Sequence, residues 1–525
     1  MFWPVVFAFS VVLLGCSDSR TSSGEEMFGF SDSDDSYGGV SMEEPSPDSG
    51  DSENDPDDGL GSEDESNFLG LRPGTTNEYV FVVNTDRDTV TRIAVPSLEV
   101  ITTVVGTRPS VVLTASDHST AVTFNVGSDD VSIIDAHTLE VTNVSVRPNL
   151  NQMAMSPDGR WVICYHDVDS EVDGASGSGS ISYNEISIVD LETFSTYETV
   201  VGAFPHDVQF TDDSANAVVI SDDYLAAITL DESGPETLRI PITDETIDPP
   251  EAEEVLLDPE GQYAIVRQYG VDSLVLVDLV TEVTELLDVG DNPTDMDLSP
   301  DGSEAFVVAR GSAEIWIYDM LDPTASADVI AMPEGSVFGS LLMSPDDTQG
   351  LLYSTVSGMA RYGVWDRSTD EVTTRSLVKP VSGVGVSPLG NTALVFHSLS
   401  NGDIDVSSPF YNHYGLTLID LSDFFANPIQ LAAEPTAHAS AADGGTGYFI
   451  MEGEPYLGVL DYDTLIHDMQ PLPSDPVYLG VLPDTNLAYI SQVHELGRIS
   501  FYDSDDSVSP LQTVTGFELN SAIEE

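Results

Sequence analysis

Short apolar segments recur along the chain from about residue 77 onward, and polar turns separate them. In the clearest copy, an alternating segment from Asn292 to Leu298 leads into the turn Ser299-Pro300-Asp301-Gly302. Proline presets φ in such a turn, aspartate caps the backbone, and glycine accepts a positive φ. Three more strand-like segments follow, over residues 304–310, 314–320 and 327–333. The pattern predicts a unit of four short antiparallel strands.

This unit recurs with a period of about 40 residues, which is typical of a repeat architecture. Further copies begin near residues 155, 257, 343 and 386, and weaker ones near 109, 205, 435 and 476. The third strand of a unit tends to end in aspartate, which we interpret as the first residue of the next turn: Asp135, Asp190, Asp278, Asp319, Asp366, Asp420, Asp461 and Asp503. The series predicts an all-β propeller of about ten four-stranded blades, within a range of about seven to ten.

The two ends of the repeat region complement each other. The first unit begins at what resembles a second strand, Tyr79 to Asn84, so it lacks an innermost strand. At the C-terminus, the segment from Phe517 to Ile523 stands where an innermost strand belongs. We therefore expect N- and C-terminal strands to share one blade, which would leave no open sheet edge in the ring.

Specific sequence elements resemble the YVTN β-propeller repeat. The segment from Asn77 to Asn84 is similar to the "YVTN" strand of that repeat, and Val131 to Asp135 matches its "VSVID" strand. The segment from Val104 to Pro109 matches the "VG-x-x-P" junction that precedes the "SPDG" turn. The resemblance covers about residues 77 to 523 and implies a propeller fold. Because that family is heterogeneous and includes surface-layer proteins and lactonase-like relatives, the resemblance does not fix a function.

The N-terminus predicts a lipoprotein signal peptide over residues 1–16. An apolar run from Phe2 to Leu14 is too short to span a bilayer but suits a signal-peptide core. It ends in Leu13-Leu14-Gly15-Cys16, which resembles the bacterial lipobox, although no Lys or Arg precedes the run. The resemblance implies cleavage after Gly15 and acylation of Cys16, which would anchor the protein to a membrane. In the bacterial lipoproteins that this segment resembles, Asp after the cysteine favours the inner membrane, so the resemblance implies that Ser17 favours the outer membrane or cell surface.

Charge and composition divide the rest of the chain in two. Residues 17–68 are rich in Asp, Glu, Ser, Gly and Pro and lack apolar periodicity, so we expect a disordered acidic tether before a propeller domain over 69–525. The whole chain carries 15 Lys and Arg against 91 Asp and Glu, a formal charge of −76. Such a surface repels nucleic acid and attracts cations, including calcium, or a basic partner.

Two groups of residues are candidates for metal or acid–base chemistry. Asp167, Asp169, Glu171 and Asp173 alternate along one loop, and alternate carboxylates on a flexible loop can converge on calcium. Separately, His206, Asp207, Asp295 and His438 stand near the starts of innermost strands, which line the centre of a propeller. These four could meet at the mouth of the channel as a metal or general-base site, or serve only as its polar lining. We assign no catalytic residue.

Two insertions, over residues 168–184 and 399–414, interrupt the period between a second and a third strand. Both should therefore emerge on the same face of the ring, and loops of this kind often carry binding residues. The second insertion contains Phe410, Tyr411 and His413, which we take as candidates for binding or for packing on the ring. Outside the lipobox, Cys164 lies in an apolar strand pattern and should be a buried, inert thiol.

The sequence favours a binding or scaffold function over an enzyme. We expect an envelope lipoprotein whose propeller recognises a protein, a glycan or another envelope component. Two alternatives stay open: a lactonase-like or metal-dependent hydrolase with a site at the channel mouth, and a structural acidic coat bridged by calcium. The sequence contains no HExxH, CxxC, GxSxG or Walker A motif that would favour a particular enzyme class.

Overall fold

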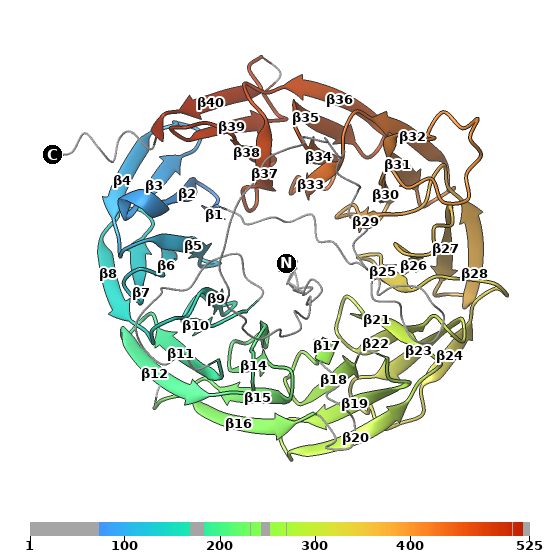
Figure 1. Cartoon of the computed structure of the whole chain (residues 1–525), viewed down its shortest axis with the longest axis horizontal. Helices are drawn as coiled ribbons and strands as arrows, with labels where there is room; N and C mark the ends of the chain where they lie inside the picture. The colour runs from blue at the N-terminus through green and yellow to red at the C-terminus, as the bar shows by residue number, and fades with distance from the viewer. Residues whose placement is uncertain are drawn as a thin grey trace, which may run out of the picture.

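The computed structural model describes residues 73–168, 183–231, 233–242, 252–268, 270–506 and 508–517, and over these it shows a ring of ten blades (Figure 1). Each blade is one four-stranded antiparallel sheet. The only helical element in the described ranges is a short 3-10 turn, η1, over Thr85–Arg87. No helix in this part of the chain is long and apolar enough to cross a membrane. The predicted all-β propeller with about ten blades is confirmed.

The strands of each blade follow one another in the sequence, from the innermost to the outermost (Figure 1). Blades one to five contain β1 (Gly74–Thr75), β2 (Tyr79–Asn84), β3 (Thr89–Ala94), β4 (Val100–Val104); β5 (Pro109–Thr114), β6 (Thr120–Asn125), β7 (Asp130–Asp135), β8 (Val141–Ser145); β9 (Gln152–Met155), β10 (Trp161–Tyr165), β11 (Glu185–Asp190), β12 (Ser195–Val200); β13 (Asp207–Phe210), β14 (Asn216–Ile220), β15 (Tyr224–Thr229), β16 (Glu236–Pro241); and β17 (Ala252–Leu257), β18 (Tyr263–Gln268), β19 (Ser273–Asp278), β20 (Val283–Asp288). Blades six to ten contain β21 (Pro293–Leu298), β22 (Glu304–Ala309), β23 (Glu314–Asp319), β24 (Asp328–Ala331); β25 (Ser340–Met343), β26 (Gln349–Tyr353), β27 (Arg361–Asp366), β28 (Glu371–Ser376); β29 (Gly383–Val386), β30 (Thr392–His397), β31 (Tyr414–Asp420), β32 (Ala426–Leu431); β33 (Pro435–Ser440), β34 (Thr446–Met451), β35 (Glu454–Asp461), β36 (Ile466–Pro471); and β37 (Pro476–Val481), β38 (Leu487–Gln492), β39 (Arg498–Asp503), β40 (Leu511–Thr515).

Aspartates that end third strands begin the next turn, as predicted. Asp135 shows the geometry: its Oδ1 accepts hydrogen bonds from the backbone nitrogens of His137, at 3.0 Å, and Thr138, at 2.7 Å. The backbone bond from Thr138 contributes most to lowering the pKa of Asp135. A carboxylate that accepts backbone N–H groups in this way stabilises the tight turn between two strands. These carboxylates are therefore structural.

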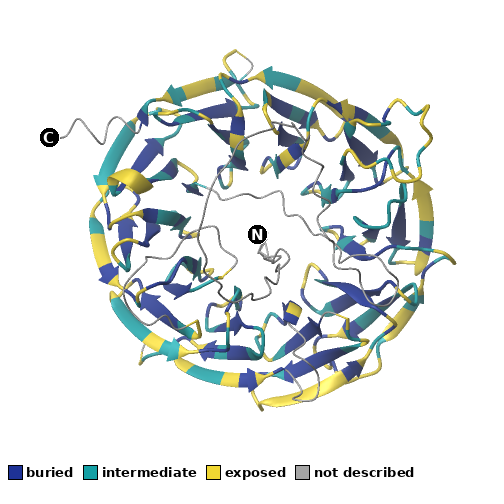
Figure 2. Ribbon diagram, in the orientation of Figure 1, coloured by how far each residue is buried: buried dark blue, intermediate teal, exposed yellow. Residues whose placement is uncertain are grey.

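The hydrophobic core consists of layers between the blades. The described residues form ten buried clusters, one at each contact between neighbouring blades. In β10, Ile163 packs toward blade four, whereas Val162 and Cys164 pack toward blade two. Because second and third strands are buried on both sheet faces, they are almost continuously apolar, while outermost strands are exposed (Figure 2). Cys164 is fully buried and burial strongly raises its pKa, which confirms the prediction of a buried thiol.

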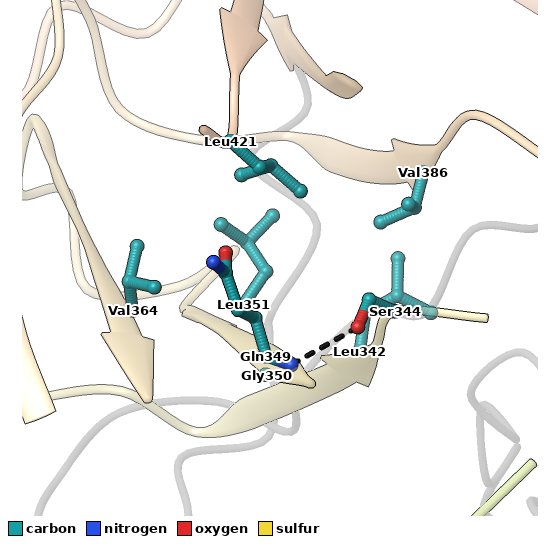
Figure 3. Close-up of a pocket in the computed structure, with 8 residues that line it drawn as sticks. All are labelled: Leu342, Ser344, Gln349, Gly350, Leu351, Val364, Val386 and Leu421. Carbon is teal, nitrogen blue, oxygen red and sulfur yellow. Dashed lines mark hydrogen bonds between the residues drawn. The ribbon is translucent and has the colours of Figure 1, made fainter. Parts of the chain in front are cut away.

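The contact between blades seven and eight shows how tightly these layers pack. Leu351 and Val364 of blade seven meet Val386 and Leu421 of blade eight, and no space for a water molecule remains between them (Figure 3). The side chain of Gln349 lies among these apolar groups, and its Oε1 has no hydrogen-bond partner in the described structure. The backbone nitrogen of Gln349 donates to Ser344 Oγ at 3.0 Å. Apolar packing between blades, rather than polar contacts, therefore dominates this interface.

The closure of the ring differs from the prediction. The innermost strand of blade one is β1, which pairs with β2 through Gly74 to Phe81 and Thr75 to Val80. Of the predicted shared strand, only Phe517 lies within the described residues, and blade ten is complete with β37 to β40. The two described ends therefore do not share a sheet. Blade one instead packs on blade ten through side chains, with Phe517 buried in that contact.

Candidate functional site

The topology gives the ring two different faces. Because the strands of a blade are consecutive and antiparallel, the turns between the first and second strands and between the third and fourth strands fall on one side. The turns between the second and third strands, and the connections from blade to blade, fall on the other. We call these sides the lower face and the upper face. All of the predicted site residues that the structure describes lie in upper-face turns or in innermost strands.

His206 and Asp207 stand at the start of β13 in blade four. His206 Nδ1 is 3.3 Å from the carbonyl oxygen of Phe204 and 3.9 Å from Asp222 Oδ1. Asp207 accepts hydrogen bonds from the backbone nitrogen of Val208, at 2.8 Å, and from Gln209 Nε2, at 3.3 Å. Desolvation raises the pKa of Asp207. The pair is thus held by its own strand and the preceding junction.

Asp295, in β21 of blade six, is only 2% exposed and connects two blades. Its Oδ2 accepts a hydrogen bond of 2.6 Å from the backbone nitrogen of Leu341 in β25 of blade seven. Asp295 also acts electrostatically on Arg267 of blade five, whose Nε donates to Glu254 Oε2 at 3.0 Å. Its carboxylate therefore belongs to a buried network across blades five to seven.

His438, in β33 of blade nine, also has a local partner. Its Nε2 is 2.8 Å from the hydroxyl of Tyr462, which in turn is 2.9 Å from Ser440 Oγ. Burial lowers the pKa of His438 to about 4, so its imidazole is neutral near pH 7. A neutral histidine hydrogen-bonded to a buried tyrosine is a packing element of blade nine.

The structure therefore distributes these four predicted residues over three blades. His206 and Asp207 are neighbours, but Asp295 lies in blade six and His438 in blade nine, on different parts of the ring (Figure 1). Over the described ranges, no group of three or more His, Cys, Asp or Glu side chains is placed to hold a metal ion. The geometry accounts for each of the four by contacts within its blade or to a neighbouring one.

The loop over residues 398–413 packs on the ring with part of its aromatic cluster. Phe410 is buried, Tyr411 is partly buried and His413 is exposed. Asn401 and Asn412 hold the loop together, because Asn401 Nδ2 donates to Asn412 Oδ1 at 2.6 Å and Asn412 N donates to Asn401 Oδ1 at 2.7 Å. Of the three predicted binding residues, His413 is the most exposed.

Lys379, the single lysine of the sequence, fastens this loop to the blade-to-blade junction. Its side chain is fully buried, and its Nζ donates to the carbonyl oxygen of His413 at 2.6 Å. Desolvation lowers the pKa of Lys379. A buried ammonium group is costly unless it is hydrogen-bonded, so this contact ties the end of the loop to the ring.

The calcium and lipid sites fall largely outside the described residues. Of the four loop carboxylates, only Asp167 is described; its backbone nitrogen donates to Asn151 Oδ1 at 2.8 Å and its carbonyl oxygen accepts from Asn151 Nδ2 at 2.7 Å. Asp169, Glu171 and Asp173 lie outside the described ranges, and so does Cys16. Calcium binding and acylation therefore remain predictions from the sequence.

One group of exposed and partly exposed aromatic residues was not expected from the sequence. His166, Tyr183 and Phe204 form a row of aromatic rings on the upper face, which we call the upper aromatic patch. Ring centroids are 5.1 Å apart between His166 and Tyr183 and 5.6 Å apart between Tyr183 and Phe204. Phe204 precedes Pro205 at a junction where other repeats carry Arg108 and Asn292. An apolar residue at a junction that is polar in these other repeats is the sequence feature from which the patch could have been predicted.

A second unexpected feature is a groove of about 890 Å³ on the lower face between blades six and seven. Arg367 lies in it and pairs with Glu304 and with Asp347, at 3.1 Å from Asp347 Oδ2. Its guanidinium carbon is 4.8 Å from the ring centroid of Phe306 and 5.2 Å from that of Trp365. The contacts around Arg367 account for its position as part of the blade interface.

Fold and surface together define the class of the protein: a ten-bladed, four-stranded β-propeller with long upper-face loops. No protein-family model matches the sequence, and no curated protein does. Among solved structures, the chain is similar to dihydro-heme d1 dehydrogenase NirN in complex with DHE, with a TM-score of 0.43 and 14% identity over 78% of this chain and 77% of that one. It is also similar to a eukaryotic initiation factor (TM-score 0.47, 11% identity, 75% and 96% covered) and to apo AztD from Citrobacter koseri (0.35, 14%, 59% and 86%). At this level of identity, the likeness extends to the fold alone.

Proposed function

We propose that the chain is a lipid-anchored envelope protein of the YVTN-repeat type, and that its propeller binds an envelope protein or glycan through the upper face. The observation that carries this proposal is the fixed loop over residues 398–413. Blade nine connects the equivalent strands, β34 and β35, through Glu452 and Gly453 alone. The longer loop is therefore not needed to close a blade. Ordering it costs conformational entropy, which supports a role in recognition.

A loop replacement tests the binding role. We expect a full-length variant with residues 398–413 replaced by Glu-Gly to keep its fold, because blade nine closes the same connection with these two residues. The variant also carries Lys379→Met, so that no buried ammonium group is left without the carbonyl oxygen of His413. The variant should lose the envelope component that the unmodified chain captures from an envelope extract after crosslinking. The measurement is mass spectrometry of the crosslinked species, with circular dichroism of both proteins as the folding control. Capture of the same species by both proteins would contradict a binding role for this loop.

Replacement of Cys16 by serine tests the anchor. A serine cannot be acylated at sulfur, so we expect the Cys16→Ser protein to leave the membrane fraction and to incorporate no labelled palmitate. The matched control is Cys164→Ala, which removes the other cysteine of the sequence at a buried position and should leave the protein in the membrane fraction. Retention of the Cys16→Ser protein in the membrane fraction would show that the lipobox interpretation is wrong.

A further inference from the structure

We propose that the upper aromatic patch is a docking site for an arginine-bearing segment of a partner protein. The inference rests on the proposed binding function and names one surface and one chemical class of partner for it. Three observations support it: the geometry of the rings, the backbone conformation of Phe204, and the charge around the patch.

The patch is built from two neighbouring blades. His166 follows β10 and Tyr183 precedes β11 in blade three, whereas Phe204 lies in the junction that leads into blade four. Tyr183 is 39% exposed and Phe204 is 37% exposed, so both rings present surface to solvent. His166 Nδ1 lies 2.7 Å from the carbonyl oxygen of Asn149, which fixes the orientation of that imidazole ring. The rings therefore form a positioned surface rather than a set of separate side chains.

The backbone at Phe204 makes this residue a costly choice for a junction. Its φ is 51°, in the left-handed region, and the equivalent residues Arg108 and Asn292 have φ values of 54° and 52°. Asparagine tolerates this region, whereas bulky residues rarely adopt it. Because more than a third of Phe204 remains exposed, core packing offsets only part of that cost. Phe194 shares this conformation and is also exposed, so what distinguishes Phe204 is its contact with the ring of Tyr183, with 5.6 Å between the ring centroids.

Acidic residues lie on the same loops and strands that carry the patch. Asp222 lies 3.9 Å from the imidazole of His206, next to Phe204, and Asp223 Oδ1 accepts from the backbone nitrogen of Ala203 at 2.9 Å. Asp167 and Asp207 both act electrostatically on Tyr165 at the end of β10. Arg147, at the junction that leads into blade three, pairs with Glu185 and with Glu198, at 3.0 Å from Glu198 Oε2. The surroundings of the rings therefore favour a positively charged group.

Aromatic faces beside carboxylates suit arginine in particular. A guanidinium group stacks on aromatic rings while its N–H groups bond to carboxylates, which an ammonium group does less well. The same chain uses this contact internally, since Arg375 lies 4.5 Å from the ring centroid of Phe424 and Arg92 lies 4.5 Å from that of Tyr79. An anionic membrane surface or a nucleic acid would be repelled by the net charge of −76. These observations point to a basic protein segment.

The test measures binding of a fluorescent, blocked peptide of alternating Gly and Arg to the full-length protein at physiological salt. We expect Phe204→Asn to weaken binding about tenfold, the loss predicted for one desolvated ring–cation contact. The variant should stay folded, because Asn292 adopts the same backbone conformation at the equivalent junction. Tyr183→Leu, which keeps apolar surface but removes the ring, should weaken binding to a similar degree. The Gly-Lys peptide should bind more weakly than the Gly-Arg peptide.

The chain offers a matched control on its lower face. Phe194, between β11 and β12, also has a left-handed backbone, with a φ of 57°, and is 49% exposed. Phe194→Asn leaves the net charge equal to that of Phe204→Asn, so both retain the general attraction of this acidic chain for cations. We expect Phe194→Asn to bind the Gly-Arg peptide like the unmodified chain. Equal affinities of the Phe194 and Phe204 variants would overturn the proposal, as would full affinity in Tyr183→Leu.

The test of the arginine site and the test of the proposed binding function can fail independently. If Phe204→Asn still captures the crosslinked envelope species that the loop replacement loses, the binding function stands and the arginine site is wrong. If the unmodified chain and the loop replacement capture the same species, the role of the loop fails, whatever the peptide result. Capture of a neutral glycan that the Gly-Arg peptide does not displace would also overturn the arginine site.

Discussion

Replacement of Arg267 by methionine is expected to lower the free energy of unfolding by about 3–5 kcal/mol, the cost typical of breaking a buried ion pair by removing one partner. Arg267 is 8% exposed, and its guanidinium pairs with Glu253 and with Glu254, which is itself 8% exposed. Methionine fills much of the same volume but leaves these carboxylates without their cation. Asp295, buried in the next blade, adds to the uncompensated negative charge. Urea unfolding at pH 7, followed by circular dichroism, measures the change.

The control for this variant is Arg361→Met. Arg361 is 35% exposed in its side chain, and its guanidinium lies 4.0 Å from Asp403, which is about half exposed. An exposed pair of this kind contributes about 0–1 kcal/mol, so this second variant should unfold close to the unmodified protein. The Arg267→Met, Glu254→Gln double variant should recover part of the loss, because it removes one of the buried charges. Equal stability of Arg267→Met and Arg361→Met would contradict a supporting role for the buried network.

The fold could be predicted from the sequence because its signals are local. Each blade repeats a turn such as Ser299-Pro300-Asp301-Gly302, in which Ser299 Oγ donates to Asp301 Oδ1 at 2.8 Å, and each is followed by apolar strands that are buried on both faces. Counting these units gave the number of blades. Closure could not be predicted in the same way. Strand β1 is only Gly74–Thr75, which is too short to carry an apolar pattern, whereas the segment after Thr515 resembles a strand.

The candidate site was less predictable because its contacts are long-range. Asp295 was placed correctly on an innermost strand, but its partner is the backbone of Leu341 in the next blade, 46 residues away in the sequence. Because this partner is far away in the sequence, the sequence could not show that the carboxylate of Asp295 connects two blades. Lys379 is conspicuous as the only lysine, yet nothing local indicates that it is buried against the carbonyl group of His413. Repeat alignment does single out Phe204, since it replaces polar residues at equivalent junctions.

Acidification in 1 M NaCl is expected to destabilise the protein in two stages. The midpoint of thermal unfolding should fall first below about pH 6.5, because burial lowers the pKa of His397 and His438 to about 4 and both take up a proton on unfolding. It should fall further below about pH 4, where the aspartates of the turns become protonated. In the described residues, eleven aspartates that accept a hydrogen bond from the backbone nitrogen two residues later have lowered pKa values: Asp135, Asp190, Asp213, Asp231, Asp278, Asp301, Asp346, Asp366, Asp405, Asp420 and Asp506. A carboxyl group with a lowered folded-state pKa stabilises the fold above its unfolded pKa, and this contribution is lost as the pH falls through the folded value.

High salt is needed because two effects have opposite signs. At low ionic strength, protonation also relieves the mutual repulsion within a chain of net charge −76, which would favour the folded state. In 1 M NaCl, screening acts over about 3 Å, so that repulsion is already largely removed at pH 7 and the contribution of the turns dominates. Burial raises the pKa of Asp207, Asp258 and Asp347, and these three groups favour the folded state on protonation. The aspartates with lowered pKa values are more numerous than these three, so the net effect of protonating the aspartates is to destabilise the fold.

A double variant measures the contribution of the aspartates in two turns. Asp301→Asn combined with Asp346→Asn removes two ionised acceptors whose lowered pKa values come chiefly from bonds to Ser303 in one turn and to Ser344 and Thr348 in the other. In 1 M NaCl, this variant should unfold at a lower temperature than the unmodified protein at pH 7. The difference should shrink toward pH 3, because protonation then removes the same ionised acceptors from the unmodified protein. A difference that stays constant across this range would show that the two carboxylates contribute by packing alone, since packing does not change when a carboxyl group takes up a proton.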